Sequence, residues 1–153
     1  MTDQSAGNGW SLPPRQRALW FIDFAEEQIR DLLPYVTGEQ NVDPPAIEAA
    51  CKESFLLNVR LVVDFLTRGD ARRDVLAADF APGWAPGAAL KARLDGWHAL
   101  ASRHAMHLSK ERLPDDVGSV EPVGPEQYRS MLIDCEEALT SFRQACAANP
   151  QNP

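Results

Sequence analysis

The stretch FLLNVRLVVDFL, residues 55–66, decides the fold. Its apolar residues cover nearly the whole circumference of a helix, and a helix that is apolar on most sides is one that several neighbours cover. Three polar residues interrupt the stretch, namely Asn58, Arg60 and Asp64. We therefore expect residues 55–66 to form the centre of a helix in the middle of an all-helical bundle.

Three further segments carry the three- and four-residue apolar spacing of amphipathic helices. The clearest stripe lies within residues 125–148 and consists of Tyr128, Met131, Leu132, Cys135, Leu139, Phe142 and Cys146. No segment alternates polar and apolar residues as a half-buried strand does. The sequence therefore predicts an all-α four-helix bundle, with helices over residues 13–33, 44–68, 88–113 and 125–148.

The chain has 153 residues, the length of one compact domain. We expect a flexible tail over residues 1–12, one helical-bundle domain over 13–148 and a second tail over 149–153. Pro34 is expected to end the first helix and Gly69 the second, because proline interrupts a helix and glycine favours its end.

A long connector, residues 69–88, separates the second helix from the third. Asp74 is expected to cap a short helical turn within it. Four apolar side chains are expected to fold back over the core as a lid: Val75, Leu76, Phe80 and Trp84.

Fifteen basic and twenty-two acidic side chains leave a formal net charge of −7. Tight non-specific binding to nucleic acid depends on basic residues that displace counterions, so this balance argues against double-stranded DNA as a partner. No apolar run approaches the roughly 20 residues that span a membrane, and the first residues lack the pattern of a secretory signal. We expect a cytoplasmic protein with no membrane partner.

Three cysteines, Cys51, Cys135 and Cys146, lie among apolar residues of predicted helices. Cys135 and Cys146 are about 16 Å apart along one helix, beyond the reach of a disulfide. We expect three small apolar side chains in a reducing compartment, with a catalytic thiol as the alternative.

Charge is divided unevenly between the last two helices. Residues 91–112 carry an excess of basic side chains, and residues 126–137 carry an excess of acidic ones. Mutual attraction, within one bundle or between two protomers, is the simplest interpretation. The alternative is an anion site on the third helix.

Two arginine–histidine pairs are candidates for phosphodiester cleavage, because a histidine can move a proton while an arginine holds a phosphate. Arg103 and His107 are four residues apart and share one helix face. Arg93 and His98 are five apart, about 140° around an ideal helix, so one straight helix does not bring them together. The alternative is that these side chains brace a neighbouring helix.

The polar residues of the second helix form a candidate binding site. Arg60 and Asp64 are four apart, the spacing of a helical ion pair, and polar groups in so apolar a stretch cost stability unless they find partners. Our leading interpretation is a network that joins the second helix to the third through His104 or His107. A ligand pocket lined by Asn58 and Arg60 is the alternative.

The sequence predicts no metal site and no cofactor. Carboxylate-bridged di-metal bundles need two Glu-x-x-His pairs and two further glutamates, and the chain supplies a single Asp-x-x-His at Asp95 and His98. Glycine-rich phosphate loops and a GxSxG elbow are absent from the sequence.

The run ESFLLNVRLVVDFLTRGDARRDVLAADFAPGW, residues 53–84, and the run SRHAMHLSKERL, residues 102–113, resemble a family of small all-helical bacterial proteins with no assigned activity. Members pair ESFLxHxRxLxDFF with DDVLAxDF and a helix ending in NKxxAHLTxxRL. The chain departs from this pattern at Asn58, where the family often has His, and at Ser102, where it often has Asn. A family site that used those two residues is altered here.

The predicted bundle is also remotely similar to the HEPN superfamily of dimeric helical bundles. Many members are metal-independent ribonucleases with an R-x(4–6)-H motif at the dimer cleft, and others are non-catalytic binding modules. Arg93 and His98 match that spacing, whereas Arg103 and His107 are one residue short of it. The resemblance implies an RNA partner only if the chain is such a ribonuclease.

We therefore expect a homodimeric, non-enzymatic interaction module that binds a protein partner. The tryptophans and the division of charge favour self-association. One alternative is a HEPN-like ribonuclease that uses the arginine–histidine pairs above, and another is a bundle that binds a small molecule.

Overall fold

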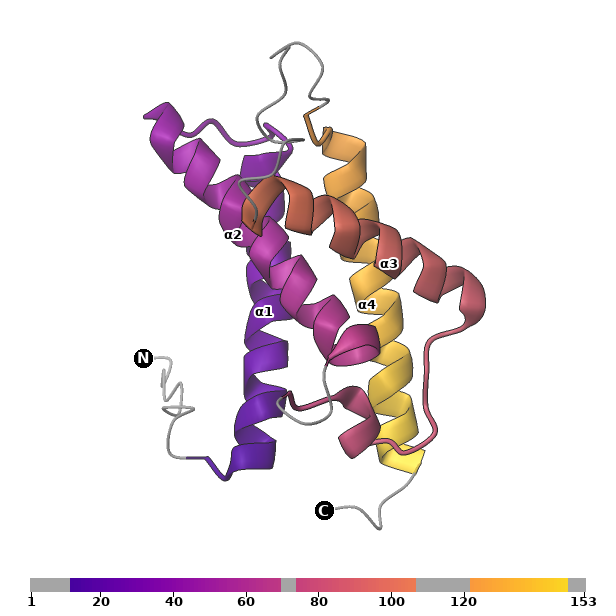
Figure 1. Ribbon diagram of the computed structural model, residues 1–153. Helices are drawn as coiled ribbons and strands as arrows, with labels where there is room; N and C mark the ends of the chain where they lie inside the picture. Colours follow the sequence, from indigo (N-terminus) through magenta and orange to yellow (C-terminus); the bar gives the residue numbers. More distant parts are fainter. Residues whose placement is uncertain (1–11, 70–73, 107–121, 149–153) are drawn as a thin grey trace.

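The computed structural model describes residues 12–69, 74–106 and 122–148, which form four α-helices and no strand. The helices are α1 (Pro14–Val36), α2 (Pro45–Val63), α3 (Ala88–Ala101) and α4 (Pro125–Ala148). α1 and α4 stand side by side, and α2 and α3 cross over them (Figure 1). The predicted all-helical bundle is confirmed. None of these helices combines the length and apolarity that a membrane crossing requires.

The core is built around α2, as its apolar sequence predicts. Phe55, Val59, Val62 and Val63 of this helix are fully buried. α4 supplies the facing stripe, and all of its predicted members up to Phe142 are buried. The residues of that stripe are Tyr128, Met131, Leu132, Cys135, Leu139 and Phe142.

Cys135 lies at the centre of this core, where burial raises the pKa of its thiol to about 12. A thiolate is the reactive form of cysteine, so this environment opposes nucleophilic chemistry at Cys135. The side chain fills the core as a small apolar group, which is the role that the sequence predicted for it.

α2 and α3 each continue into a π turn, Asp64–Arg68 and Ser102–Met106 respectively. The amide of Gly69 donates to the carbonyl of Asp64 at 2.9 Å, the five-residue step that closes a π turn. Gly69 ends the second helix, as predicted. A side chain at this position would collide with Leu76 of the connector, so the glycine also allows the connector to approach α2.

The predicted end of the first helix is wrong, because α1 continues past Pro34 to Val36. Proline removes one amide donor from a helix, and near the final turn that loss is small. The amide of Thr37 still donates to the carbonyl of Leu33 at 3.0 Å, and Val36 is buried. Packing of the last turn therefore outweighs the missing bond.

The connector contains a 3-10 turn, Ala77–Asp79, that begins later than predicted. The carboxylate of Asp79 accepts the amide of Leu76 at 2.8 Å, so Asp79 rather than Asp74 caps the turn.

The predicted lid over the core is confirmed for its two aromatic residues. Phe80 is buried between Phe65 and Phe142, with ring centroids 6.0 and 6.4 Å apart. The Trp84 ring lies 5.4 Å from Phe142. Val75 is half exposed and does not belong to the lid.

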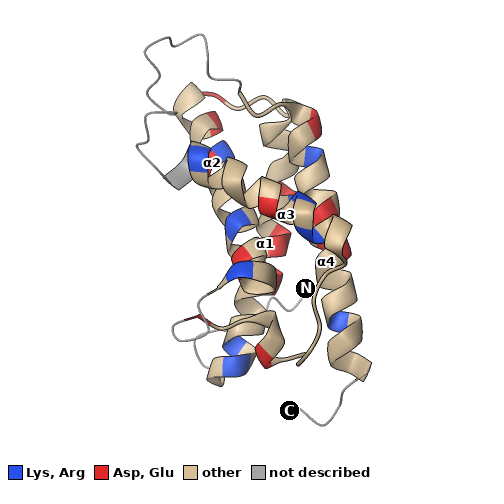
Figure 2. Ribbon diagram, turned by 45° about the vertical axis from the view of Figure 1, so that its right-hand side comes forward, with Lys and Arg blue, Asp and Glu red and all other residues tan. Residues whose placement is uncertain are grey.

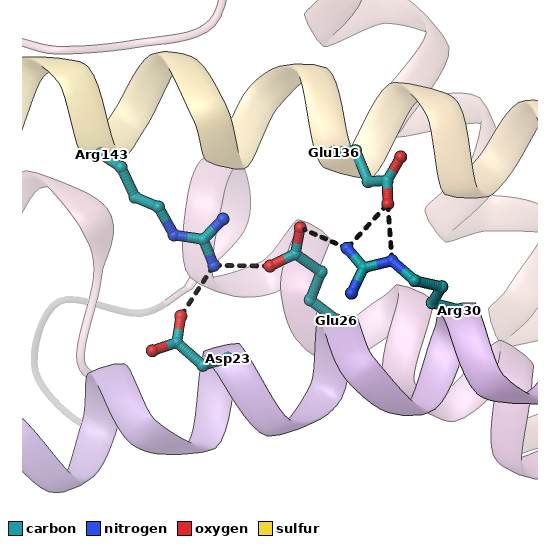
Figure 3. A network of polar contacts seen from close by, with 5 residues as sticks. All are labelled: Asp23, Glu26, Arg30, Glu136 and Arg143. Atoms are coloured by element: carbon teal, nitrogen blue, oxygen red, sulfur yellow. Dashed lines mark hydrogen bonds and ion pairs between the residues drawn. The ribbon is translucent and has the colours of Figure 1, made fainter.

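A polar network fastens α1 to α4 (Figure 3). Glu26 of α1 is buried and accepts hydrogen bonds from Arg30 on its own helix and from Arg143 on α4. Arg143 also donates to Asp23 at 2.7 Å, and Arg30 donates to Glu136 of α4 at 2.8 Å. Each arginine thus bridges two carboxylates, and the buried carboxylate between them is neutralised.

A second buried carboxylate fastens α3 to α4. Asp134 is 5% exposed, and its two oxygens accept from Arg93 Nε at 2.9 Å and from Trp97 Nε1 at 2.7 Å. Basic and acidic residues lie side by side where α3 crosses α4 (Figure 2). The attraction predicted between these helices therefore operates within one bundle.

We expect Asp134→Asn to lower the free energy of unfolding by about 1–3 kcal/mol, because the asparagine NH2 would face one of the two donors, Arg93 Nε or Trp97 Nε1, at a buried position. Glu137→Gln is the matched control, since Glu137 meets Arg93 at 3.3 Å on the exposed side. Its loss should cost no more than about 0.5 kcal/mol. Urea denaturation of the two variants makes the measurement, and equal effects would contradict this assignment.

Candidate functional site

Three charged residues on α2 and its π turn, Arg60, Asp64 and Arg68, form what we call the polar row. The imidazole of His98, on α3, contacts two residues of this row. His98 Nε2 lies 2.9 Å from Asp64 Oδ1, and Arg68 Nη1 lies 2.7 Å from His98 Nδ1. Arg60 Nε contacts the other oxygen of Asp64 at 3.4 Å. Polar contacts therefore join the second and third helices, and they place His98 in this network, a histidine that the sequence did not assign to it.

The partners of His98 define its protonation. A guanidinium can only donate hydrogen bonds, so Nδ1 must accept from Arg68 and carries no proton. Nε2 then carries the proton and donates it to the Asp64 carboxylate. The contacts assign a neutral imidazole held between an anion and a cation.

Burial lowers the pKa of His98 below its usual value, and the charges of Arg68 and Arg60 lower it further. Asp64 acts in the opposite direction. The side chain of His98 is only 16% exposed, so loss of solvent outweighs the attraction of the single carboxylate. The lowered pKa agrees with the neutral form that the hydrogen bonds require.

A second carboxylate, Asp95 of α3, borders this cluster. Lys91 Nζ donates to Asp95 Oδ2 at 2.8 Å and lowers the pKa of Asp95. Arg68 Nε approaches the other oxygen of Asp95 only to 3.6 Å, beyond ordinary hydrogen-bond distance. Asp95 is therefore mainly the partner of Lys91.

The polar row forms one wall of a groove with a volume of about 770 Å³. α2 and its π turn line the groove from Leu57 to Arg68, and α1 lines it with Ala18, Phe21 and Ile22. The connector closes the end with Asp74, Val75 and Leu76. The walls are thus apolar on the α1 side and along Leu57 and Leu61, and charged along the polar row.

One atom of this wall lacks the partner that buried polar groups normally have. Arg60 Nη1 is buried and makes no hydrogen bond with any residue that the structure describes. The side chain as a whole is 27% exposed, so the guanidinium is held at the edge of the groove by its Nε contact alone.

The structure separates Arg93 from His98. Arg93 extends toward α4, where it binds Asp134 and Glu137, whereas His98 extends toward α2. The two side chains thus contact different helices, which agrees with their angular separation on α3. No shared anion site forms between them.

Three other predicted site residues, Asn58, Arg103 and His104, do not line the groove. Asn58 donates to the carbonyl of Ser54 on its own helix at 2.8 Å and does not line the groove. Arg103 and His104 lie in the π turn that follows α3. His107 falls outside the described residues, so its pairing with Arg103 and its place in the network with the second helix stay predictions.

Sequence reasoning missed the junction of Asp64, Arg68 and His98, because 30 residues separate Arg68 from the histidine. One signal was present in the sequence. Arg68, Asp64 and His98 are polar residues within or beside apolar segments, and such groups have to find partners.

Comparison of the chain with models of protein families, with curated proteins and with solved structures finds no match in any of the three. The resemblances drawn from the sequence motifs therefore stay expectations. The groove and its polar row are the features of the chain that bear on its function.

We expect the free energy of unfolding to fall as the pH is lowered from about 7 to about 5, because the unfolded chain protonates His98 at its usual pKa of about 6.5 before the folded state does. His98→Gln should remove this part of the pH dependence. The glutamine amide can donate to Asp64 and its oxygen can accept from Arg68, yet it does not titrate.

Urea denaturation at a series of pH values measures both proteins. The wild type should lose more stability than His98→Gln across this range. Parallel pH profiles would show that His98 does not carry the effect.

Proposed function

We propose that the protein is a non-enzymatic interaction module that binds an amphipathic helix of a partner protein in the groove between α1, α2 and the connector. A single observation carries this proposal, namely that large apolar side chains are left in solvent along the groove. Leu57 and Leu61 are each 43% exposed, and Val75 across from them is 50% exposed.

The exposed leucines lie one helical turn apart on the same face of α2. A single exposed leucine on a protein surface has no special meaning, but a row of them beside a groove marks an interaction site. Phe24 of α1, which is 43% exposed and stacks on Trp20, adds further apolar surface on the neighbouring helix.

The dimensions of the groove fit a helix. The α2 wall runs from Leu57 to Arg68, about 16 Å at the rise of a helix and therefore three turns long. Grooves of this kind receive the apolar face of a partner helix through residues spaced at i, i+3, i+4 and i+7. The charged polar row then lies beside the polar flank of such a helix.

The test places a photo-crosslinking phenylalanine analogue at position 61 and, as a control, at position 133. Ile133 is the most exposed large apolar residue of the described chain and lies on α4, away from the groove. In the cells from which the protein comes, position 61 should capture a specific protein and position 133 should not. A product of twice the chain mass would instead identify a second copy, the homodimer that the sequence predicts.

Reconstitution with the purified partner completes the test. Leu57→Ser combined with Leu61→Ser should weaken binding by at least about tenfold, since buried interface leucines contribute roughly 1–2 kcal/mol each. Thermal stability should change little, because both residues are half exposed in the free protein. Equal capture from both positions, or unchanged affinity of the double variant, would refute the proposal.

A further inference from the structure

One arginine of the polar row, Arg68, has only a long contact to a carboxylate. Asp64 already accepts from both His98 and Arg60. Arg68 donates to a neutral imidazole and forms an ion pair with Asp95 at 3.6 Å, which is longer than the 2.8 Å from Lys91 to the other oxygen of Asp95. Within the described chain, no carboxylate hydrogen bond to the Arg68 guanidinium is recorded.

Arg68 is also the more exposed of the two arginines in the row. Its side chain is 42% exposed, and it lines both the groove and a smaller hollow of about 220 Å³ on the connector side. The groove is also lined by Arg60 and by two carboxylates. One is Asp64, which is 40% exposed and is held by His98 and Arg60, and the other is Asp74 of the connector wall. A guanidinium presents paired donors that match a carboxylate, so the exposed part of Arg68 suits an acidic group.

We infer that Arg68 binds a glutamate or aspartate side chain of the partner helix, and that His98 takes up a proton when this happens. The inference rests on the proposed helix-binding function and specifies its partner as an amphipathic helix with acidic residues beside its apolar stripe. The carboxylate draws Arg68 Nη1 away from His98 Nδ1, and the freed nitrogen accepts a proton from solvent.

The charges around His98 determine how binding of a carboxylate at Arg68 changes the protonation of His98. Asp64, Arg60 and Arg68 face the imidazole from α2 and its π turn, and Asp95 lies beside it on α3. Arg68 and Arg60 lower the pKa of His98 in the free protein. Neutralising Arg68 removes part of this effect, so the pKa of His98 rises on binding. The imidazolium then pairs with Asp64, and the affinity for the acidic helix increases as the pH falls.

The experiment uses the full chain and two synthetic peptides, each an amphipathic helix about five turns long with leucines at i, i+3, i+4 and i+7. One peptide carries glutamates on both flanks of the leucine stripe, and the other carries glutamines. Fluorescence anisotropy measures their affinities at about pH 5.5 and about pH 7.5, on either side of an ordinary histidine pKa.

The glutamate peptide should bind about tenfold more tightly than the glutamine peptide, the effect of roughly 1.4 kcal/mol. This preference is diagnostic, because the net charge of −7 on the chain opposes an acidic ligand in general. Arg68→Gln should abolish the preference. The glutamate peptide should also bind more tightly at the lower pH, and His98→Gln should remove that dependence.

The outcomes separate three claims, namely the carboxylate site, the proton coupling and the helix-binding function. Equal binding of both peptides by the wild type, or a preference that survives in Arg68→Gln, would overturn the carboxylate site and leave the apolar groove intact. A pH dependence that persists in His98→Gln would overturn the proton coupling. The helix-binding function itself would be overturned if neither peptide bound. It would also be overturned if the double variant Leu57→Ser, Leu61→Ser bound the peptides with unchanged affinity.

Discussion

The fold depends on α2, which has to be buried against the other helices and also has to carry charged side chains. Phe55, Val59 and Val62 are fully buried, because α2 contacts each of the other three helices. The same helix and its π turn carry the polar row, whose charges cannot enter that core. The row therefore lies along one edge of α2, where α3 supplies partners on one side and the groove remains open on the other.

Two buried polar networks that hold the helices together do not involve the polar row. The network around Glu26 joins α1 to α4, and Asp134 joins α3 to α4. Both buried carboxylates are satisfied by arginine and, at Asp134, by Trp97. The polar row differs, since Arg60 Nη1 has no recorded partner and Arg68 relies on a neutral imidazole. Incomplete satisfaction of this kind is expected where a protein binds something else.

Local signals predicted most of the fold. The apolar spacing on α4 identified its buried stripe through Phe142, and Gly69 marked the end of the second helix. The end of α1 was missed because tertiary packing of Val36 outweighs the amide that Pro34 lacks.

The site was less predictable than the fold. Arg60 and Asp64 were recognised as a pair from their spacing on one helix, and the structure records that contact. The partner histidine was assigned to His104 or His107, whereas His98 makes the recorded bonds to the polar row.

The helix crossing and the π turn explain why this site could not be predicted. The angle at which α2 crosses α3 decides which face of α3 meets Asp64, and the π turn at Asp64–Arg68 shifts the position of Arg68. Neither feature can be recognised from the helical periodicity of the sequence. The groove likewise depends on α1 and the connector, which sequence spacing could not place beside α2.

The central claim is that a neutral His98 holds Arg68 at the edge of the groove. Nitrogen-15 NMR of the ring nitrogens in the free, full-length protein at about pH 7 tests it directly, because the shifts distinguish the two neutral tautomers from the imidazolium. The account predicts that His98 is neutral, with its proton on Nε2 and an acceptor at Nδ1. A proton on Nδ1, or a fully protonated ring, would contradict it, because Arg68 could not then donate to that nitrogen.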